Sequence, residues 1–198
     1  MQRIGIFGGS FDPIHQGHLA IARCALEQLS LDRVYFVPAA RSPFKQKVSL
    51  TVSNADRVAM IRRLIEDNPR FEVSTWELEQ GGVSYTVDTL RHFRKEYPDS
   101  DCFFLMGEDS YGGFEGWKNP GEIRQLSHLV VAPRTASSGA SKMTLGCADQ
   151  DQPLYLNMPL CDISSTQLRV QLMQARETAL AGLPGPVQQY IREHGLYQ

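Results

Sequence analysis

The chain has 198 residues, of which 42% are hydrophobic and 21% are charged, and its formal net charge is −2. A chain of this length can bury one substantial core, so a single domain spanning residues 1–198 is predicted. The nearly balanced charge provides no overall field that would attract a nucleic acid, and we expect instead a small partner held by local groups.

The four cysteines are far apart in the sequence and form no CxxC pair, which is typical of free thiols in a reducing compartment. They are Cys24, Cys102, Cys147 and Cys161. No apolar stretch approaches the roughly 20 residues that a membrane-spanning helix requires, so no membrane partner is expected. These features predict a soluble, cytoplasmic protein.

Short apolar segments rich in Val, Ile and aromatic residues predict five buried strands. They are residues 3–7, 33–38, 71–76, 102–106 and 128–132. Helical apolar stripes lie between them, over 21–29, over 58–65 behind a Ser53 cap, and over 87–93 behind a Thr86 cap. The alternation predicts a Rossmann-like α/β fold, a doubly wound parallel sheet with helices on both faces, whose ligands bind beyond the carboxyl ends of the strands.

The last third of the chain has a different pattern. Residues 134–152 are rich in Ser, Ala, Gly and Asp with weak periodicity, and we expect a loop there. Residues 153–156 then predict an edge strand, Ser165 a helix cap, and 184–194 a last helix. A small helical portion, about 164–198, is therefore expected to pack on the domain.

A candidate phosphate-binding motif follows the first predicted strand. It reads Gly8-Gly9-Ser10-Phe11-Asp12-Pro13-Ile14-His15-Gln16-Gly17-His18. Paired glycines let the backbone approach a ligand, a helix N-terminus offers N–H groups, and two imidazoles three residues apart can reach the same oxygens. The run is neither a Walker A loop nor a G-x-G-x-x-G fingerprint, which disfavours ordinary NTP hydrolysis and hydride transfer.

Other interpretations of this motif remain open. The two glycines taken alone are more typical of a tight turn between strand and helix. Asp12, His15 and His18 could also ligate a metal, but the intervening Gly17 and the missing Glu fit no zinc signature, so no metal site is predicted.

At these residues the chain resembles the HxGH-type nucleotidyltransferases, and specifically the bacterial nicotinate-nucleotide adenylyltransferase family. The resemblance covers nearly the whole length in ordered blocks: 8–18, Arg57 with Met60, 84–90, 106–109 with Phe114 and Trp117, 162–169, 190–191 and 196–197. It implies transfer of the adenylyl group of ATP, with Mg2+, to nicotinate mononucleotide, giving nicotinate adenine dinucleotide and pyrophosphate in NAD biosynthesis.

The resemblance also implies the roles of individual residues. Catalytic roles are implied for His15, His18 and Arg169. ATP binding is implied for Gly8, Gly9, Ser10, Phe11, Asp12, His15, Gly17, His18, Gly107, Asp109, Ile163, Ser164, Ser165, Thr166 and Arg169. Binding of the pyridine mononucleotide is implied for Lys45, Ser84, Tyr85, Thr86, Asp88, Trp117 and Arg134.

Simpler explanations exist for some of these residues. Ser165 with Arg169 fits an ordinary helix cap followed by a solvated arginine, Asp109 fits a cap, and Trp117 fits a core anchor. The chain also departs from the family pattern, since Phe44 stands where the family usually has a histidine and residues 133–134 match only part of an Arg-Pro-Gly block.

The alternatives for function are the same reaction with nicotinamide mononucleotide, a pantetheine-phosphate adenylyltransferase or cytidylyltransferase, and a fragment of a class I aminoacyl-tRNA synthetase. Residues 84–90 and 162–169 argue against the pantetheine-phosphate adenylyltransferase and the cytidylyltransferase, and the chain is too short for the synthetase. A nucleotide-sensing protein of the same fold is the alternative without catalysis. A homo-oligomer is compatible with the sequence.

Overall fold

The computed structural model describes residues 1–43, 50–133, 152–159, 161–174 and 180–198. Its centre is a six-stranded parallel sheet with the strand order β3-β2-β1-β4-β5-β6. The strands are β1 (Arg3–Gly9), β2 (Arg33–Pro38), β3 (Phe71–Val73), β4 (Asp101–Gly107), β5 (His128–Ala132) and β6 (Leu154–Tyr155). This order confirms the Rossmann-like fold, and it places the topological switch point between β1 and β4.

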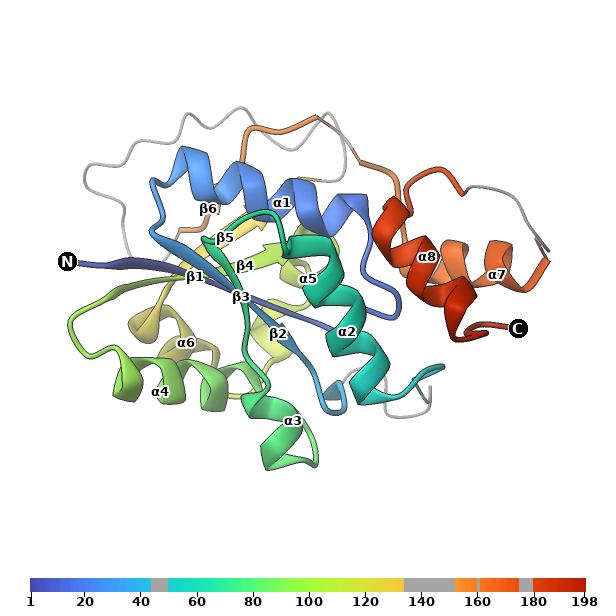
Figure 1. Ribbon diagram of the computed structural model, residues 1–198. Coiled ribbons are helices and arrows are strands. Elements are labelled where there is room, and N and C mark those ends of the chain that lie inside the picture. Colours follow the sequence, from blue (N-terminus) through green and yellow to red (C-terminus); the bar gives the residue numbers. More distant parts are fainter. Residues whose placement is uncertain (44–49, 134–151, 160, 175–179) are drawn as a thin grey trace.

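Helices cover both faces of the sheet, as Figure 1 shows. The helices are α1 (Gln16–Gln28), α2 (Asn54–Ile65), α3 (Trp76–Gln80), α4 (Thr86–Glu96), α5 (Glu108–Tyr111), α6 (Pro120–Leu126), α7 (Ser165–Gln174) and α8 (Gly185–Glu193), with a 3-10 turn η2 (Phe114–Gly116). In Figure 1, α1 and α2 lie above the sheet and α4 and α6 below it, while α7 and α8 lie near the end of α2. No helix in the described part of the chain is both long and apolar enough to span a membrane.

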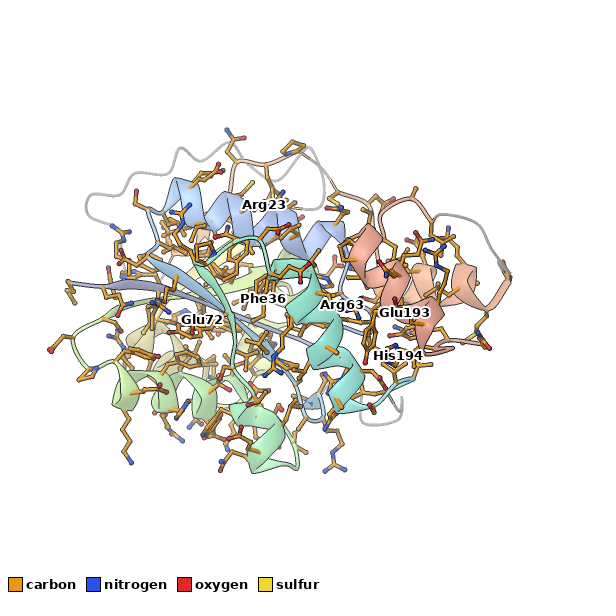
Figure 2. The ribbon with its side chains drawn as sticks, in the orientation of Figure 1. Arg23, Phe36, Arg63, Glu72, Glu193 and His194 are labelled. Carbon is orange, nitrogen blue, oxygen red and sulfur yellow. The ribbon has the colours of Figure 1, made fainter. Side chains whose placement is uncertain are left out.

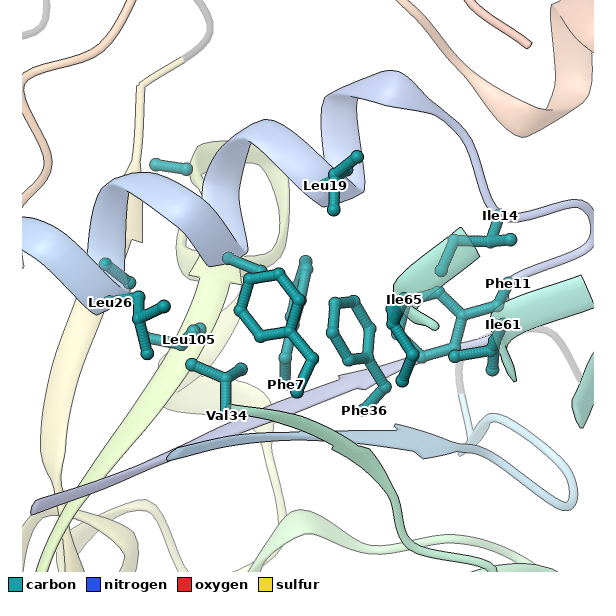
Figure 3. Packing of buried hydrophobic residues seen from close by; sticks show 14 of the residues in the cluster. Phe7, Phe11, Ile14, Leu19, Leu26, Val34, Phe36, Ile61, Ile65 and Leu105 are labelled. Atoms are coloured by element: carbon teal, nitrogen blue, oxygen red, sulfur yellow. The ribbon is translucent and has the colours of Figure 1, made fainter. Parts of the chain in front are cut away.

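The strand side chains alternate between two cores, one on each face. On β4, Phe103 and Leu105 join the core beneath α1 and α2, whereas Phe104 and Met106 join the core beneath α4 and α6. Figure 3 shows the first core, where the rings of residues such as Phe36 fill the space between helix and sheet. Because both faces are buried, the strands read as continuous apolar runs rather than as alternating patterns.

The structure corrects one predicted strand. The strand expected over 71–76 ends at Val73, because Trp76 begins the short helix α3. The Trp76 indole stacks on the imidazole of His92 from α4, with 4.6 Å between ring centres. Helices α3, α5 and α6 were not predicted, because each is shorter than the window in which a helical period becomes visible.

One of the three predicted helix caps is confirmed. The Ser53 hydroxyl accepts a hydrogen bond from the N–H of Asp56 at 3.1 Å. The Thr86 cap was wrong, since Tyr85 is the N-cap of α4. The Ser165 cap was also wrong: Ser164 Oγ accepts the bond from the helix, while Ser165 begins α7 and its hydroxyl donates to the carbonyl of Pro13 at 2.9 Å.

The C-terminal helix α8 is fastened to α2, as Figures 1 and 2 show. An Arg63 nitrogen lies 3.2 Å from a Glu193 carboxylate oxygen. The Tyr190 hydroxyl donates to Oδ1 of Asp56 at 3.0 Å, and the Arg63 guanidinium lies over the Tyr190 ring. Val187 of α8 is fully buried in the core beneath α1 and α2, so the C-terminal portion shares the main core.

The cysteines of the described residues are all free thiols. Cys102 is buried, and Cys24 and Cys161 are half-buried, while Cys147 lies outside the described residues. Burial raises the pKa of the Cys102 thiol, which disfavours the reactive thiolate.

Candidate active site

A cavity of about 710 Å³ opens at the carboxyl ends of the strands. Gly8 and Gly9 line it from the end of β1, Met106 and Gly107 from the end of β4, and Ala132 from the end of β5. It therefore lies at the switch point between β1 and β4, where ligands bind in doubly wound sheets. Its volume is within the range of small-molecule sites.

The cavity collects most of the residues predicted for ATP. These are Gly8, Gly9, Ser10, His15, Gly17, His18, Gly107, Asp109, Ile163, Ser164, Ser165 and Thr166. Gly107 is the N-cap of α5, so the structure does not support Asp109 as a helix cap.

The two motif histidines lie at the start of α1 and line the cavity. Their ring centres are 3.7 Å apart, and the backbone N–H of His15 donates to Nδ1 of His18 at 3.2 Å. Because Nδ1 of His18 accepts this bond, Nε2 carries the proton in the neutral ring. The pair thus presents an imidazole N–H together with a helix N-terminus, a combination suited to phosphate oxygens.

Gly17 is required by the close packing of the motif. A Cβ atom at this position would lie 3.1 Å from the ring of His15 and 3.3 Å from Sγ of Cys161. A side chain here would push His15 from its place or separate α1 from the segment that precedes α7. The glycine between the two histidines therefore allows both to reach the cavity.

Phe11 and Asp12 belong to the motif but do not line the cavity. Phe11 is buried in the core, where its ring meets that of Phe7 edge-on at 5.6 Å. Asp12 is 4% exposed and accepts hydrogen bonds from the Tyr197 hydroxyl at 2.7 Å and from the N–H of Thr51 at 3.0 Å. Both residues therefore hold the loop in place from its core side, away from the cavity.

Arg169 reaches the same loop from α7. Its guanidinium donates to the backbone carbonyl of Asp12 at 2.6 Å and to the Thr166 hydroxyl at 3.2 Å. It does not line the cavity, so the structure places it beside the predicted ATP site rather than at its surface.

Arg57 supports the loop that lines the cavity, although no role was predicted for it. Its side chain is fully buried, and it donates to the carbonyls of Ser10 at 2.8 Å and Ala39 at 2.7 Å, and to Oδ1 of Asn54 at 2.7 Å. Burial lowers the pKa of the guanidinium, and the charge of Asp12 opposes that effect. The available signal was that Arg57, with Met60, is one of the blocks by which the chain resembles its family.

The residues predicted for the pyridine mononucleotide are only partly brought together. Ser84, Tyr85, Thr86 and Trp117 line the cavity. Asp88 does not line it; its carboxylate is paired instead with Arg91 at 2.8 Å and Lys118 at 2.9 Å. Lys45 and Arg134 lie outside the described residues, as does Phe44.

Trp117 is both a core residue and part of the cavity wall. It lines the cavity, and its indole packs against Phe104 at 6.0 Å and Phe114 at 5.5 Å between ring centres. The core beneath α4 and α6 thus extends to the wall of the cavity at Trp117.

Three charged residues without a predicted role also line the cavity: Glu77 of α3, Glu108 of α5 and Lys118. Glu77 is 7% exposed. Lys118 directly follows Trp117, and a cation adjacent to a predicted aromatic wall in a site for anions was the signal that could have identified it. Nothing in the sequence pattern distinguished Glu77 from its neighbour Glu79.

The chain is similar to known proteins over its whole length. A family model described as cytidylyltransferase-like matches residues 6–171. A protein of Thermomicrobium roseum, named "Probable nicotinate-nucleotide adenylyltransferase", is 38% identical over 200 residues, covering 100% of this chain and 92% of that protein. A protein of the same name from Thermus thermophilus is 41% identical over 199 residues, covering 99% and 100%.

Solved structures share the fold at lower identity. The Plasmodium falciparum nicotinic acid mononucleotide adenylyltransferase complexed with NaAD has a TM-score of 0.78 at 18% identity, covering 100% of this chain and 98% of that one. The same enzyme complexed with APC has a TM-score of 0.75.

Proposed function

The chain belongs to the cytidylyltransferase-like family and, within it, to the nicotinate-nucleotide adenylyltransferases, and on this premise we propose that it joins ATP to nicotinate mononucleotide. The products are nicotinate adenine dinucleotide and pyrophosphate, and the reaction serves NAD biosynthesis. The observation that carries the proposal is one cavity lined by His15 and His18 at the start of α1, by residues 164–166 at the start of α7, and by Tyr85 and Trp117.

The chemistry requires positioning more than proton transfer. A phosphate oxygen of the mononucleotide attacks the α-phosphorus of ATP, and the bond from that phosphorus to the oxygen bridging to the β-phosphorus breaks as pyrophosphate leaves. A phosphate monoester has a second pKa of about 6, so it is already an anionic nucleophile at neutral pH and needs no general base. The protein must hold two polyanions together and stabilise the charge that develops on pyrophosphate.

We propose that the start of α1 stabilises this developing charge. His18 carries a proton on Nε2 in its neutral form, and His15 lies stacked beside it in the cavity wall. The N–H groups at the first turn of α7 and the hydroxyls of residues 164–166 suit the far end of the triphosphate. Arg169 supports both sites by holding the Asp12 carbonyl and the Thr166 hydroxyl.

We propose that the pyridine ring stacks on Trp117 and that the carboxylate of nicotinate meets the start of α4. The first N–H groups of a helix have no partner within it, and the N-cap Tyr85 makes no side-chain bond to them. Donors of this kind suit a carboxylate better than a carboxamide, whose NH2 would face them.

Mg2+ enters this proposal as part of the substrate. No group of three or more His, Cys, Asp or Glu side chains suited to a metal ion occurs in the described ranges. We therefore propose that the ion arrives with ATP, bound mainly by phosphate oxygens and water, as is common for Mg2+ in nucleotide sites. We propose the cytoplasm as the place of the reaction between ATP and nicotinate mononucleotide.

The test is pyrophosphate release by the purified protein from ATP, Mg2+ and nicotinate mononucleotide. Parallel reactions replace the mononucleotide with nicotinamide mononucleotide or pantetheine phosphate, or ATP with CTP. We expect turnover with ATP and nicotinate mononucleotide at about ten-fold or more the kcat/KM of the amide. The proposed reaction would be refuted if pyrophosphate were released only with pantetheine phosphate or only with CTP. It would also be refuted if none of these acceptors supported pyrophosphate release.

A further inference from the structure

Glu77 presents a puzzle in a site that binds anions. Its side chain is 7% exposed and lines the cavity that, under the proposed function, receives two polyanionic nucleotides. A buried carboxylate is costly unless it is hydrogen-bonded, and near a substrate anion it is also repulsive. Such a residue is retained only where its hydrogen bonds contribute something else to the site.

Those hydrogen bonds lead to both sides of the turn that begins α4. Oε1 of Glu77 accepts from the hydroxyl of Thr89, one turn into the helix, at 2.5 Å. The side chain of Ser84, immediately before the N-cap Tyr85, acts on the same carboxyl and lowers its pKa. The Glu77 carboxylate therefore lies beside the segment 84–86, which lines the cavity at the start of α4.

Ser84 extends the connection to the loop after β2. Its hydroxyl accepts a hydrogen bond from the N–H of Ala40 at 2.9 Å, and its own N–H donates to the carbonyl of Arg41 at 2.9 Å. Arg57 holds the neighbouring carbonyl of Ala39 at 2.7 Å. The cavity wall at Ser84 is therefore joined by half-buried hydrogen bonds to the loop that carries Ala39, which also lines the cavity.

The electrostatics agree with a carboxylate that acts as a double acceptor. Burial raises the pKa of the Glu77 carboxyl above its ordinary value, while the bonds from Ser84 and Thr89 and the charge of Arg57 oppose the rise. A carboxylate has two acceptor oxygens and no donor, so it can accept from both hydroxyls at once. A glutamine has the same shape but only one such oxygen, and its NH2 group would face one of the two hydroxyls.

We propose that Glu77 is a positioning residue for the second substrate: its carboxylate fixes residues 84–86 so that the N–H groups at the start of α4 meet the carboxylate of nicotinate. Glu77 itself acts through Ser84 and Thr89, and it makes the pocket select the acid over the amide. The inference rests on the proposed function and adds the residue that sets its specificity.

The experiment compares Glu77→Gln with Glu79→Gln, a matched change on the same short helix at an exposed position that does not line the cavity. Calorimetry measures the Kd of nicotinate mononucleotide, and steady-state kinetics give kcat/KM for the acid and the amide and the KM for ATP. Losing one charge-assisted hydrogen bond corresponds to roughly a ten-fold change. For Glu77→Gln we expect the Kd to rise and the ratio of acid to amide kcat/KM to fall by about that factor, with the KM for ATP within about two-fold.

Thr89→Val gives a second test that leaves the carboxylate in place. Val has the shape of Thr but no hydroxyl, so this variant removes only the bond to Oε1, and we expect the same changes at about three-fold. Equal losses for the acid, the amide and ATP, or an unchanged ratio of acid to amide, would overturn the inference. A wild-type protein that releases no pyrophosphate would instead overturn the proposed function, so the two failures are distinguishable.

Discussion

Nζ of Lys118 lies 2.9 Å from Oδ2 of Asp88 and 4.3 Å from the centre of the Tyr85 ring. The same carboxylate is bonded to Arg91, whose guanidinium also forms two bonds to Glu122. Asp88 is therefore shared between two cations, and it holds Lys118 at the cavity wall without lining the cavity itself. Asp88, which was predicted to bind the substrate, thus orients Lys118, which lines the cavity.

Replacing Lys118 with Met should weaken the preference for the acid substrate. Met keeps the apolar stem over Tyr85 but removes a positive charge at the cavity wall, which we expect to attract the nicotinate carboxylate. Because the Lys118 side chain is 42% exposed, solvent screens its charge, and we expect only about a two- to five-fold loss of kcat/KM for nicotinate mononucleotide. The amide substrate should be affected less, and the difference should shrink at high salt.

The control for this change is Lys95→Met, which removes an exposed cation from α4 at a position outside the cavity wall. Its kinetic constants should match those of the wild type. An equal loss for the acid and the amide in Lys118→Met would show that the lysine supports the fold of the pocket rather than the recognition of the carboxylate.

Replacing His18 with Ala should lower kcat by about 100-fold or more while the KM for ATP stays within several-fold. This pattern is expected when a donor stabilises charge that develops mainly in the transition state. His128→Ala, at a half-buried histidine on β5 outside the cavity wall, is the control. A kcat for His18→Ala equal to that of the wild type would remove this residue from the chemistry.

The fold was largely predictable because it follows from local patterns. Apolar runs located the five main strands, and the glycine-rich run identified the start of α1 where His15 and His18 meet the cavity. The helix caps were less predictable, since Ser164 and Ser165 are chemically alike and only the contact of Ser165 with Pro13 decides which one caps α7.

The supports of the site were not predictable, because they join residues that no sequence period relates. Asp12 meets Tyr197 across 185 positions, and Arg57 meets Ser10 across 47. Such contacts depend on how elements pack in three dimensions. Asp12 lies in the loop that was predicted to bind phosphate, but its two oxygens accept hydrogen bonds from Thr51 and Tyr197 of the chain itself.

Replacing Tyr197 with Phe should loosen the phosphate loop. Its buried hydroxyl donates to Oδ1 of Asp12 at 2.7 Å, and removing it leaves a buried carboxylate oxygen without that bond. We expect the free energy of unfolding to fall by about 1 to 3 kcal/mol and the KM for ATP to rise several-fold. Urea unfolding and steady-state kinetics measure the two effects.

Tyr35→Phe is the matched control for this change. It removes the hydroxyl of another buried tyrosine, which is bonded to the hydroxyl of Tyr97 at 2.9 Å under the opposite face of the sheet. This variant should lose stability while its KM for ATP stays unchanged. A rise in the KM for ATP of the same size in both variants would contradict a specific role for the bond between Tyr197 and Asp12.

The attachment of α8 to α2 should weaken in acid through Asp56. The hydrogen bond from Ser53, and then that from Tyr190, lower the pKa of this carboxyl below its ordinary value of 3.8. A carboxyl whose pKa is lowered by folding stabilises the native state fully above the ordinary value, and this stabilisation is lost as the pH falls through the lowered pKa. The free energy of unfolding, measured with urea, should therefore depend more steeply on pH below about 4 in the wild type than in Asp56→Asn. This variant has no titrating group at position 56. Tyr190→Phe removes only the smaller of the two bonds, so its sensitivity to acid should be intermediate. Parallel curves for all three proteins between pH 5 and pH 3 would refute the assignment to Asp56.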